Sequence, residues 1–161
     1  MALRRGLLAG TLSATVVLAA CQSGDRMAVS WTGADTGQAT LAARAMRCRG
    51  EVRMFATSGD TGVAIVLFPN AKVLATGDFP VLAPTEARET RPAAAVASRW
   101  TDSVRVEGYR GVEGTVRVTV RPRGLDGEFR ALVRRDGDLA EVTLRGRFSG
   151  IAVGACADTA G

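Results

Sequence analysis

The chain has 161 residues, of which 47% are hydrophobic, and its formal net charge of +5 includes the two positive charges of Arg4 and Arg5. This length is that of a single domain, and so small a positive excess gives no argument for a nucleic-acid partner. The sequence contains no histidine, which excludes Ser-His-Asp and Cys-His catalysis and zinc sites built on histidine. An enzyme built from this sequence would have to use carboxylates, a Ser/Lys pair or a thiol.

The first twenty residues have the pattern of a secretory signal peptide. Arg4 and Arg5 form a short positive segment, and the uncharged apolar segment 7–20 that follows is too short to span a bilayer comfortably. It ends in the run LAAC, whose cysteine is Cys21. This run resembles the lipobox of bacterial lipoproteins. The resemblance implies that residues 1–20 are removed as a lipoprotein signal peptide and that Cys21 becomes the lipidated first residue. A plain secreted protein, or a core helix with an incidental cysteine, is the alternative.

Lipidation at Cys21 would make the lipid bilayer the first partner of this protein. Two or three acyl chains anchor a protein firmly in a bilayer, because each buried CH₂ contributes roughly 0.8 kcal/mol to membrane binding. One chain alone binds only marginally. The resemblance places the domain outside the cytoplasm, on the cell membrane or on an outer membrane. Gln22 and Ser23 follow the cysteine, so no Asp stands second in the mature chain. In a Gram-negative source this favours the outer membrane. Residues 21–37 are rich in Gly, Ser and Asp, so we expect the lipidated cysteine and a flexible tether there.

Residues 38–156 are predicted to form a single β domain, and residues 157–161 a frayed tail. The pattern at 38–47 is ambiguous between helix and strand. Alternating and continuous apolar patterns predict further elements: strands at 51–57, 63–68 and 72–76, a hairpin return at 77–81, the longest loop at 83–92, and an edge strand at 94–100.

The clearest β signal lies in the last third of the chain. Residues 114–120, 128–134 and 139–148 each alternate between apolar and polar side chains, which predicts an antiparallel meander with one face in solvent. An Asp-Gly pair at Asp136 is a strong hairpin signal. The whole pattern predicts an all-β fold of seven to nine short strands, an antiparallel β-sandwich with a small β-barrel as the alternative.

The order of short strands also resembles small uncharacterised bacterial lipoproteins. The resemblance rests on a GDFPV segment and on a final strand with the pattern GxFSG that leads to a cysteine. It implies no enzymatic activity.

Two cysteines remain once Cys21 is assigned to the anchor. Outside the cytoplasm two remaining thiols most often form a disulfide, so we expect a bond between Cys48 and Cys156 that ties the first part of the domain to its last strand. Two free buried thiols are the alternative, and the pair is not in the CxxC arrangement of redox sites.

An arginine-rich outer face is the candidate binding site. In the predicted meander six arginines point outward together, opposed directly by Glu128 and Glu141: Arg117, Arg121, Arg130, Arg134, Arg145 and Arg147. Such a face could grip phosphate or carboxylate groups of an anionic envelope component or of a protein partner. The alternative is a solvated face whose arginines pair with nearby acids.

The sequence therefore predicts a membrane-anchored envelope lipoprotein with a non-enzymatic binding or structural domain, without cofactor or metal. The alternative function is a small β-barrel that carries a lipid or another apolar ligand in a cavity beneath residues 63–68. A third hypothesis, hydrolysis by two carboxylates such as Asp60 and Asp78, is weaker, because aspartates at such positions are usually turn residues.

Overall fold

The structure is a computed structural model, and it describes residues 25–102, 105–135, 137–138 and 140–156. The expected signal peptide, the expected lipidation site Cys21 and the expected tail at 157–161 lie outside the described residues.

The described part of the chain contains ten strands, more than the seven to nine that were expected, and one short helix. In chain order they are β1 (Arg26–Gly33), β2 (Gly37–Cys48), β3 (Glu51–Ser58), β4 (Thr61–Phe68), β5 (Gly77–Pro80), α1 (Pro84–Glu89), β6 (Ala93–Asp102), β7 (Arg105–Arg121), β8 (Gly124–Arg135), β9 (Glu141–Ile151) and β10 (Val153–Ala155).

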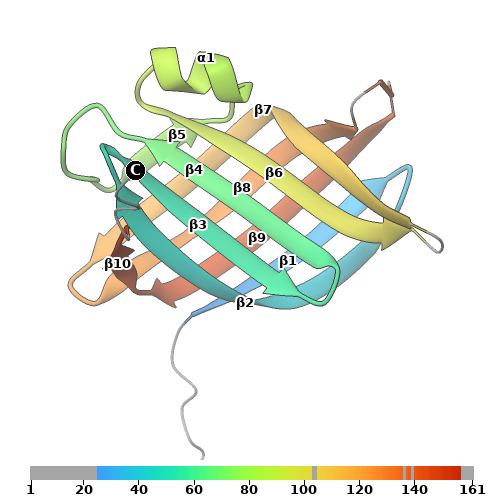
Figure 1. Cartoon of the computed structure of the whole chain (residues 1–161), viewed down its shortest axis with the longest axis horizontal. Helices are drawn as coiled ribbons and strands as arrows, with labels where there is room; N and C mark the ends of the chain where they lie inside the picture. Colours follow the sequence, from blue (N-terminus) through green and yellow to red (C-terminus); the bar gives the residue numbers. More distant parts are fainter. Residues whose placement is uncertain (1–24, 103–104, 136, 139, 157–161) are drawn as a thin grey trace, which may run out of the picture.

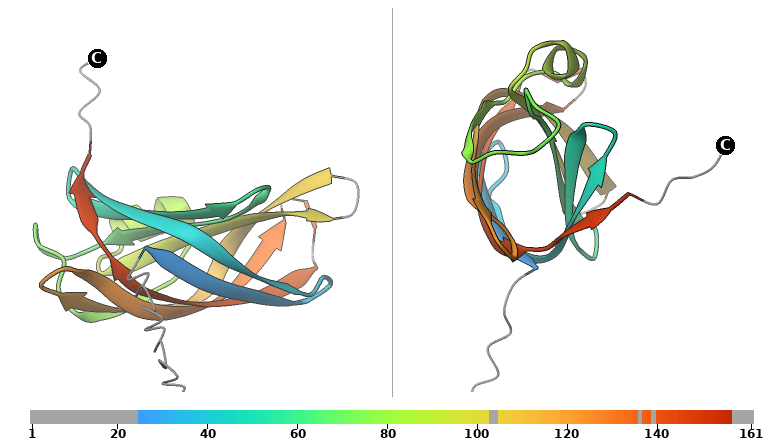
Figure 2. Two further views of the ribbon diagram at one scale, coloured as in Figure 1. Left: turned by 90° about the horizontal axis from the view of Figure 1, so that it is seen from below. Right: turned by 90° about the vertical axis from the view of Figure 1, so that its left-hand side faces the viewer.

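Eight of these strands form a closed antiparallel barrel. The hydrogen-bonded order is β1-β9-β8-β7-β6-β4-β3-β2, and β2 pairs again with β1, so the ring has no open edge. Figure 1 shows the tilted strands from the side, and the right-hand view of Figure 2 looks along the barrel. The small barrel, our alternative, is therefore confirmed and the sandwich is wrong, because β1 pairs on both of its sides.

Strand β1 occupies a segment for which the sequence predicted a tether. Met27, Val29 and Trp31 alternate along it, and all three are buried in the core. The structure thus differs from the expected tether at 21–37, since the barrel begins at Arg26. The alternation is short and flanked by Gly and Asp, which explains why composition suggested a linker instead.

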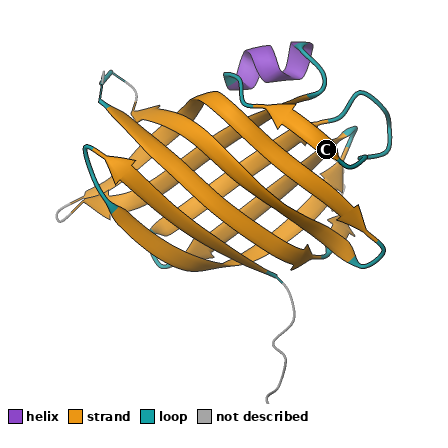
Figure 3. Ribbon diagram, turned by 180° about the vertical axis from the view of Figure 1, so that it is seen from behind, coloured by secondary structure: helices purple, strands orange, loops and turns teal. Residues whose placement is uncertain are grey.

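Three further elements differ from expectation in the middle of the chain. Segment 94–100 belongs to β6, which lies between β4 and β7 rather than at an edge. Strand β5 pairs with β7 and so is not the return of a hairpin from 72–76. The predicted loop at 83–92 contains α1, which covers the outer face of β6 by packing Ala87 against apolar residues that include Ala93 and Ala95. Figure 3 shows this helix outside the barrel wall.

The barrel interior is filled by side chains. Ile65 and Leu67, the inward residues of β4, have no accessible surface, and the same holds for Met54, Leu41 and Leu144 on other strands. A side chain with no accessible surface lines no space that a water molecule can enter. The described strands therefore leave no cavity of the kind expected beneath residues 63–68.

Aromatic rings lying over inward glycines contribute to this packing. Each ring belongs to the residue directly opposite the glycine on the neighbouring strand: Trp31 on Gly37, Phe148 on Gly127 and Phe129 on Gly146. A Cβ at Gly146 would lie 2.4 Å from a carbon of the Phe129 ring. A glycine is therefore required wherever a ring covers the backbone this closely.

A stack of three aromatic rings fills one end of the interior. Trp100 lies 4.9 Å from Trp31 and 4.1 Å from Tyr109 between ring centroids. The indole N–H of Trp31 donates to Asp35, whereas the N–H of Trp100 and the hydroxyl of Ser98 are buried without a hydrogen-bond partner among the described residues. This end, where β1 stops and β2 starts, is called the distal end below.

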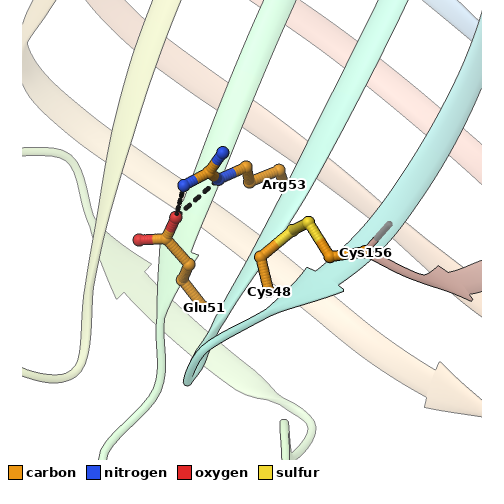
Figure 4. The surroundings of a disulfide bond; sticks show 4 residues. All are labelled: Cys48, Glu51, Arg53 and Cys156. Carbon is orange, nitrogen blue, oxygen red and sulfur yellow. Dashed lines mark hydrogen bonds and ion pairs between the residues drawn. A yellow bond between two sulfur atoms is a disulfide. The ribbon is translucent and has the colours of Figure 1, made fainter. Parts of the chain in front are cut away.

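The opposite end, called the proximal end, carries the start of β1, the β2–β3 and β7–β8 turns and a disulfide. The expected bond between Cys48 and Cys156 is present, with the two Cα atoms 5.0 Å apart and 108 residues of sequence separation. It ties the end of β2 to the residue after β10, which runs parallel to β2; Figure 4 shows it beside the Glu51–Arg53 ion pair. The chain-entropy estimate for so long a loop is about 4.7 kcal/mol.

Candidate functional site

The six predicted arginines lie on the outer wall of the barrel, on β7, β8 and β9. The inward residues that define this wall, such as Val116, Phe129 and Leu144, are buried as the alternation predicts. Val120, also expected to point inward, is instead 40% exposed at the proximal end. The alternation thus correctly separates the two faces over most of the meander.

Acidic neighbours compensate Arg117 and two of the other arginines. Arg117 donates to Asp78 on β5 at 2.9 Å and to Glu128 on β8 at 3.4 Å. The hydrogen bond from Arg117 holds the pKa of Asp78 below its usual value, so this carboxyl stays ionised and neutralises the arginine. The sequence pattern does not predict Asp78 as a partner of Arg117, because it gives no sign that β5 lies beside β7.

Arg121 and Arg134 at the two ends of this wall are paired as well. Arg121 donates to Asp126 at 3.1 Å, and Arg134 pairs with Glu141. The pKa of Asp126 is lowered first by the backbone N–H of Gly150 and then by Arg121. This part of the wall matches the solvated, ion-paired face that was the alternative to a binding site.

Arg130 and Arg145 are different. They lie directly opposite each other on β8 and β9, both exposed, and neither has an ion pair with any described residue. Residues directly opposite on one face have Cβ atoms about 4.5–5.5 Å apart, and like charges there are destabilising. Two uncompensated guanidinium groups are thus held side by side.

A groove runs along the wall beside this pair. The pairing register sets Thr115, Arg130, Arg145, Ser30 and Gln38 in one row across five strands. Because the residues on β1 are small and the arginines are long, the wall is hollowed there.

We call this hollow the arginine groove. Its volume is about 600 Å³, within the range of about 300–1,000 Å³ that is usual for ligand sites. Its outward lining residues are Ala28, Ser30, Gln38, Thr115, Arg117, Glu128, Arg130, Arg145 and Arg147.

Arg147 adds a third, weakly compensated cation to the groove. Its nearest acid is Glu128 at 3.8 Å, and Glu128 is shared with Arg117. A guanidinium offers five N–H donors in a planar fork that matches phosphate and carboxylate oxygens. Arg130, Arg145 and Arg147 together are therefore suited to a multivalent anion, with Ser30 as a neutral hydrogen-bonding neighbour.

The groove is lined mainly by arginines and small polar side chains, with one glutamate. Among the described residues there is no group of three or more metal-ligating side chains. The carboxylates considered for hydrolysis have separate partners: Asp60 accepts a hydrogen bond from Thr101 on β6, and Asp78 binds Arg117. The structure therefore does not bring these two carboxylates into one cleft.

The sequence did not predict an ionic cluster that surrounds one buried carboxylate at the distal end. Glu107 is only 5% exposed and pairs with Arg105 at 2.7 Å and with Arg135, which in turn pairs with Asp138. Hydrogen bonding by Arg135 is the main cause of the lowered pKa of Glu107. Alternation extended along β7 from the inward Val116 and Val118 would place Glu107 outward. The bulge between Gly111 and Glu113 reverses the phase and turns Glu107 inward, opposite Trp100.

Comparison of the chain with protein-family models, with curated proteins and with solved structures finds no match. Within the described ranges, no helix is long and apolar enough to cross a membrane.

Proposed function

We propose that the protein is a membrane-anchored envelope lipoprotein whose barrel is a non-enzymatic binding module for an anionic partner. The observation that carries the binding role is the uncompensated Arg130–Arg145 pair in the arginine groove. The anchor is proposed from the LAAC run that ends at Cys21, and the location is the cell membrane or an outer membrane.

The groove favours an anion with several charged oxygens, such as a phosphorylated or polycarboxylated component of the envelope. Two adjacent guanidinium groups repel each other when no anion occupies the groove. A multivalent anion between them would replace that repulsion with bidentate hydrogen bonds. Thr115 and Gln38 at the ends of the row supply neutral polar groups. Because the groove is open to solvent, salt weakens such binding.

The alternative function, a barrel that carries a lipid inside, has less support. Its ligand needs an interior space, whereas inward residues such as Ile65, Met54 and Leu144 have no accessible surface. The packed interior therefore favours a ligand on the outer wall.

The anchor is tested by Cys21→Ser in the full chain, expressed in a bacterium that processes lipoproteins. We expect the wild-type protein to sediment with membranes and to incorporate labelled palmitate, and the variant to do neither. A variant that stays in the membrane fraction with unchanged labelling would show that Cys21 is not the lipidation site.

The groove is tested by titrating the purified protein with inorganic pyrophosphate at low salt in a calorimeter. We expect the double substitution Arg130→Gln and Arg145→Gln to weaken binding at least tenfold. Arg134→Gln is the matched control, because Arg134 lies on the same wall but is paired with Glu141. Equal binding by the wild type and the double variant would remove the groove from consideration as an anion site.

A further inference from the structure

A second hollow, called the proximal pocket, lies at the proximal end of the barrel. It has a volume of about 280 Å³, which is small for a whole ligand but large enough for a polar group. Its lining includes Arg47, Leu74, Val120, Arg123, Leu125 and Ala152, from several strands and turns.

The lining combines cationic residues at the opening with an apolar floor. Arg47 and Arg123 are exposed and have no ion pair with a described residue. Leu74 and Leu125 at the floor are 5% and 2% exposed, respectively. This is the composition of a surface that meets both charged headgroups and hydrocarbon.

Exposed apolar side chains lie at the edge of the pocket and beside it. Val73, next to Leu74 in sequence, is 63% exposed, and the pocket residue Val120 is 40% exposed. The backbone N–H of Val120 donates to the hydroxyl of Thr76, so the loop that carries Val73 is held beside the end of β7. The arginine groove has a different lining, with polar Ser30 and Gln38 beside its arginines.

The described chain begins beside the proximal pocket. The carboxylate of Asp25 accepts a hydrogen bond from the backbone N–H of Ala152, a pocket residue, at 3.2 Å. The carbonyl of Asp25 accepts another from the backbone N–H of Ala43 at 2.6 Å. Cys21 precedes Asp25 by four residues, and four residues span at most about 14 Å even when fully extended. An acylated Cys21 therefore keeps the pocket within reach of the bilayer surface.

We propose that the proximal pocket docks on the membrane that holds Cys21, with Arg47 and Arg123 binding the headgroup of an anionic phospholipid and Val73 entering the interface. This inference rests on the proposed lipid anchor. It gives the barrel a fixed orientation, in which the proximal end faces the bilayer and the distal end faces away.

The test uses the full lipidated chain in vesicles that contain phosphatidylglycerol. A photocrosslinking amino acid replaces Val73 in one variant and Val106 in another. Val106 is a matched control, because it is 50% exposed but lies at the start of β7, at the distal end. We expect lipid adducts at position 73 to exceed those at position 106 at least tenfold.

The arginines are tested in the same assay, with the crosslinker at Val73. Each of Arg47→Gln and Arg123→Gln should lower adduct formation with phosphatidylglycerol about fivefold, because a basic residue near an anionic surface contributes about 1 kcal/mol. Arg99→Gln, an exposed arginine on β6 away from the pocket, should leave it unchanged.

The outcomes separate the docking proposal from the anchor. Membrane-bound protein with equal adducts at positions 73 and 106 would overturn the docking surface and leave the anchor in place. Loss of the wild-type chain from the vesicles would overturn the anchor and, with it, this inference. Adducts at position 73 that do not respond to either arginine substitution would show that the headgroup is not bound by the pocket.

Discussion

The substitution Gly146→Ala tests the idea that the barrel is filled by rings lying over glycines. The added Cβ would lie 2.4 and 2.5 Å from two carbons of the Phe129 ring and 2.9 Å from the carbonyl oxygen of Ala28. Phe129 is 4% exposed, so its ring has no free space to enter. Overpacking of this kind costs about 1–3 kcal/mol, and the smaller conformational freedom of the unfolded alanine chain offsets about 0.4–1 kcal/mol of that cost. We expect a net loss of about 1–2 kcal/mol.

Urea unfolding measures this loss, with the fluorescence of the buried Trp31 and Trp100 as the signal. Gly108→Ala is the matched control, because a Cβ at Gly108 meets nothing within 4 Å; its stability should stay level or rise. Adding Phe129→Leu to Gly146→Ala should cost less than the sum of the two single changes, since it removes the ring that the Cβ strikes. A Gly146→Ala protein as stable as the Gly108→Ala control would refute the reasoning.

Three other expectations concern the disulfide, the buried acid and the arginine pair. Cys48→Ala should lower the free energy of unfolding by about 2–5 kcal/mol and should make urea unfolding insensitive to a reductant. A reductant effect that persists in this variant would mean that a different disulfide is present. The pKa of Glu107 is lowered from 4.5 in the folded state, so its contribution to folding stability is complete above pH 4.5. This contribution is lost as the pH falls through the folded-state pKa. The urea midpoint of Glu107→Gln should accordingly fall less steeply with acid than that of the wild type, and parallel curves would contradict this. Arg145→Gln should raise stability by about 0.2–1 kcal/mol at low salt by removing a like-charge pair, whereas Arg134→Gln, which breaks a pair, should not.

The meander and the disulfide could be predicted because their signals are local or compositional. Alternation over residues 114–148 correctly assigns the inward residues Val116, Phe129 and Leu144, since a strand with one solvated face has a period of two. The pairing of Cys48 with Cys156 followed from counting thiols. Neither inference required knowledge of which strands are neighbours.

The closure of the sheet could not be predicted, because it depends on pairing between distant segments. Nothing in the segment around Met27 shows that it pairs with both β2 and β9, and the same is true of β5 beside β7. The arginine site depended on this information as well. Asp78 compensates Arg117 only because β5 pairs with β7 and sets these two residues opposite each other. The sequence therefore could not distinguish compensated arginines from Arg130 and Arg145.

The position of β1 between β2 and β9 has a consequence for the order of assembly. A chain that is made from its amino terminus presents β1 early, yet one side of β1 has no partner until β9, the last long strand, has been made. Until then its free backbone groups form an exposed edge that can pair with other chains. Pairing between opposite ends of a chain is also slow to form. The nascent protein should therefore spend its longest vulnerable period with an almost complete but open sheet, which is the state that a chaperone would have to protect.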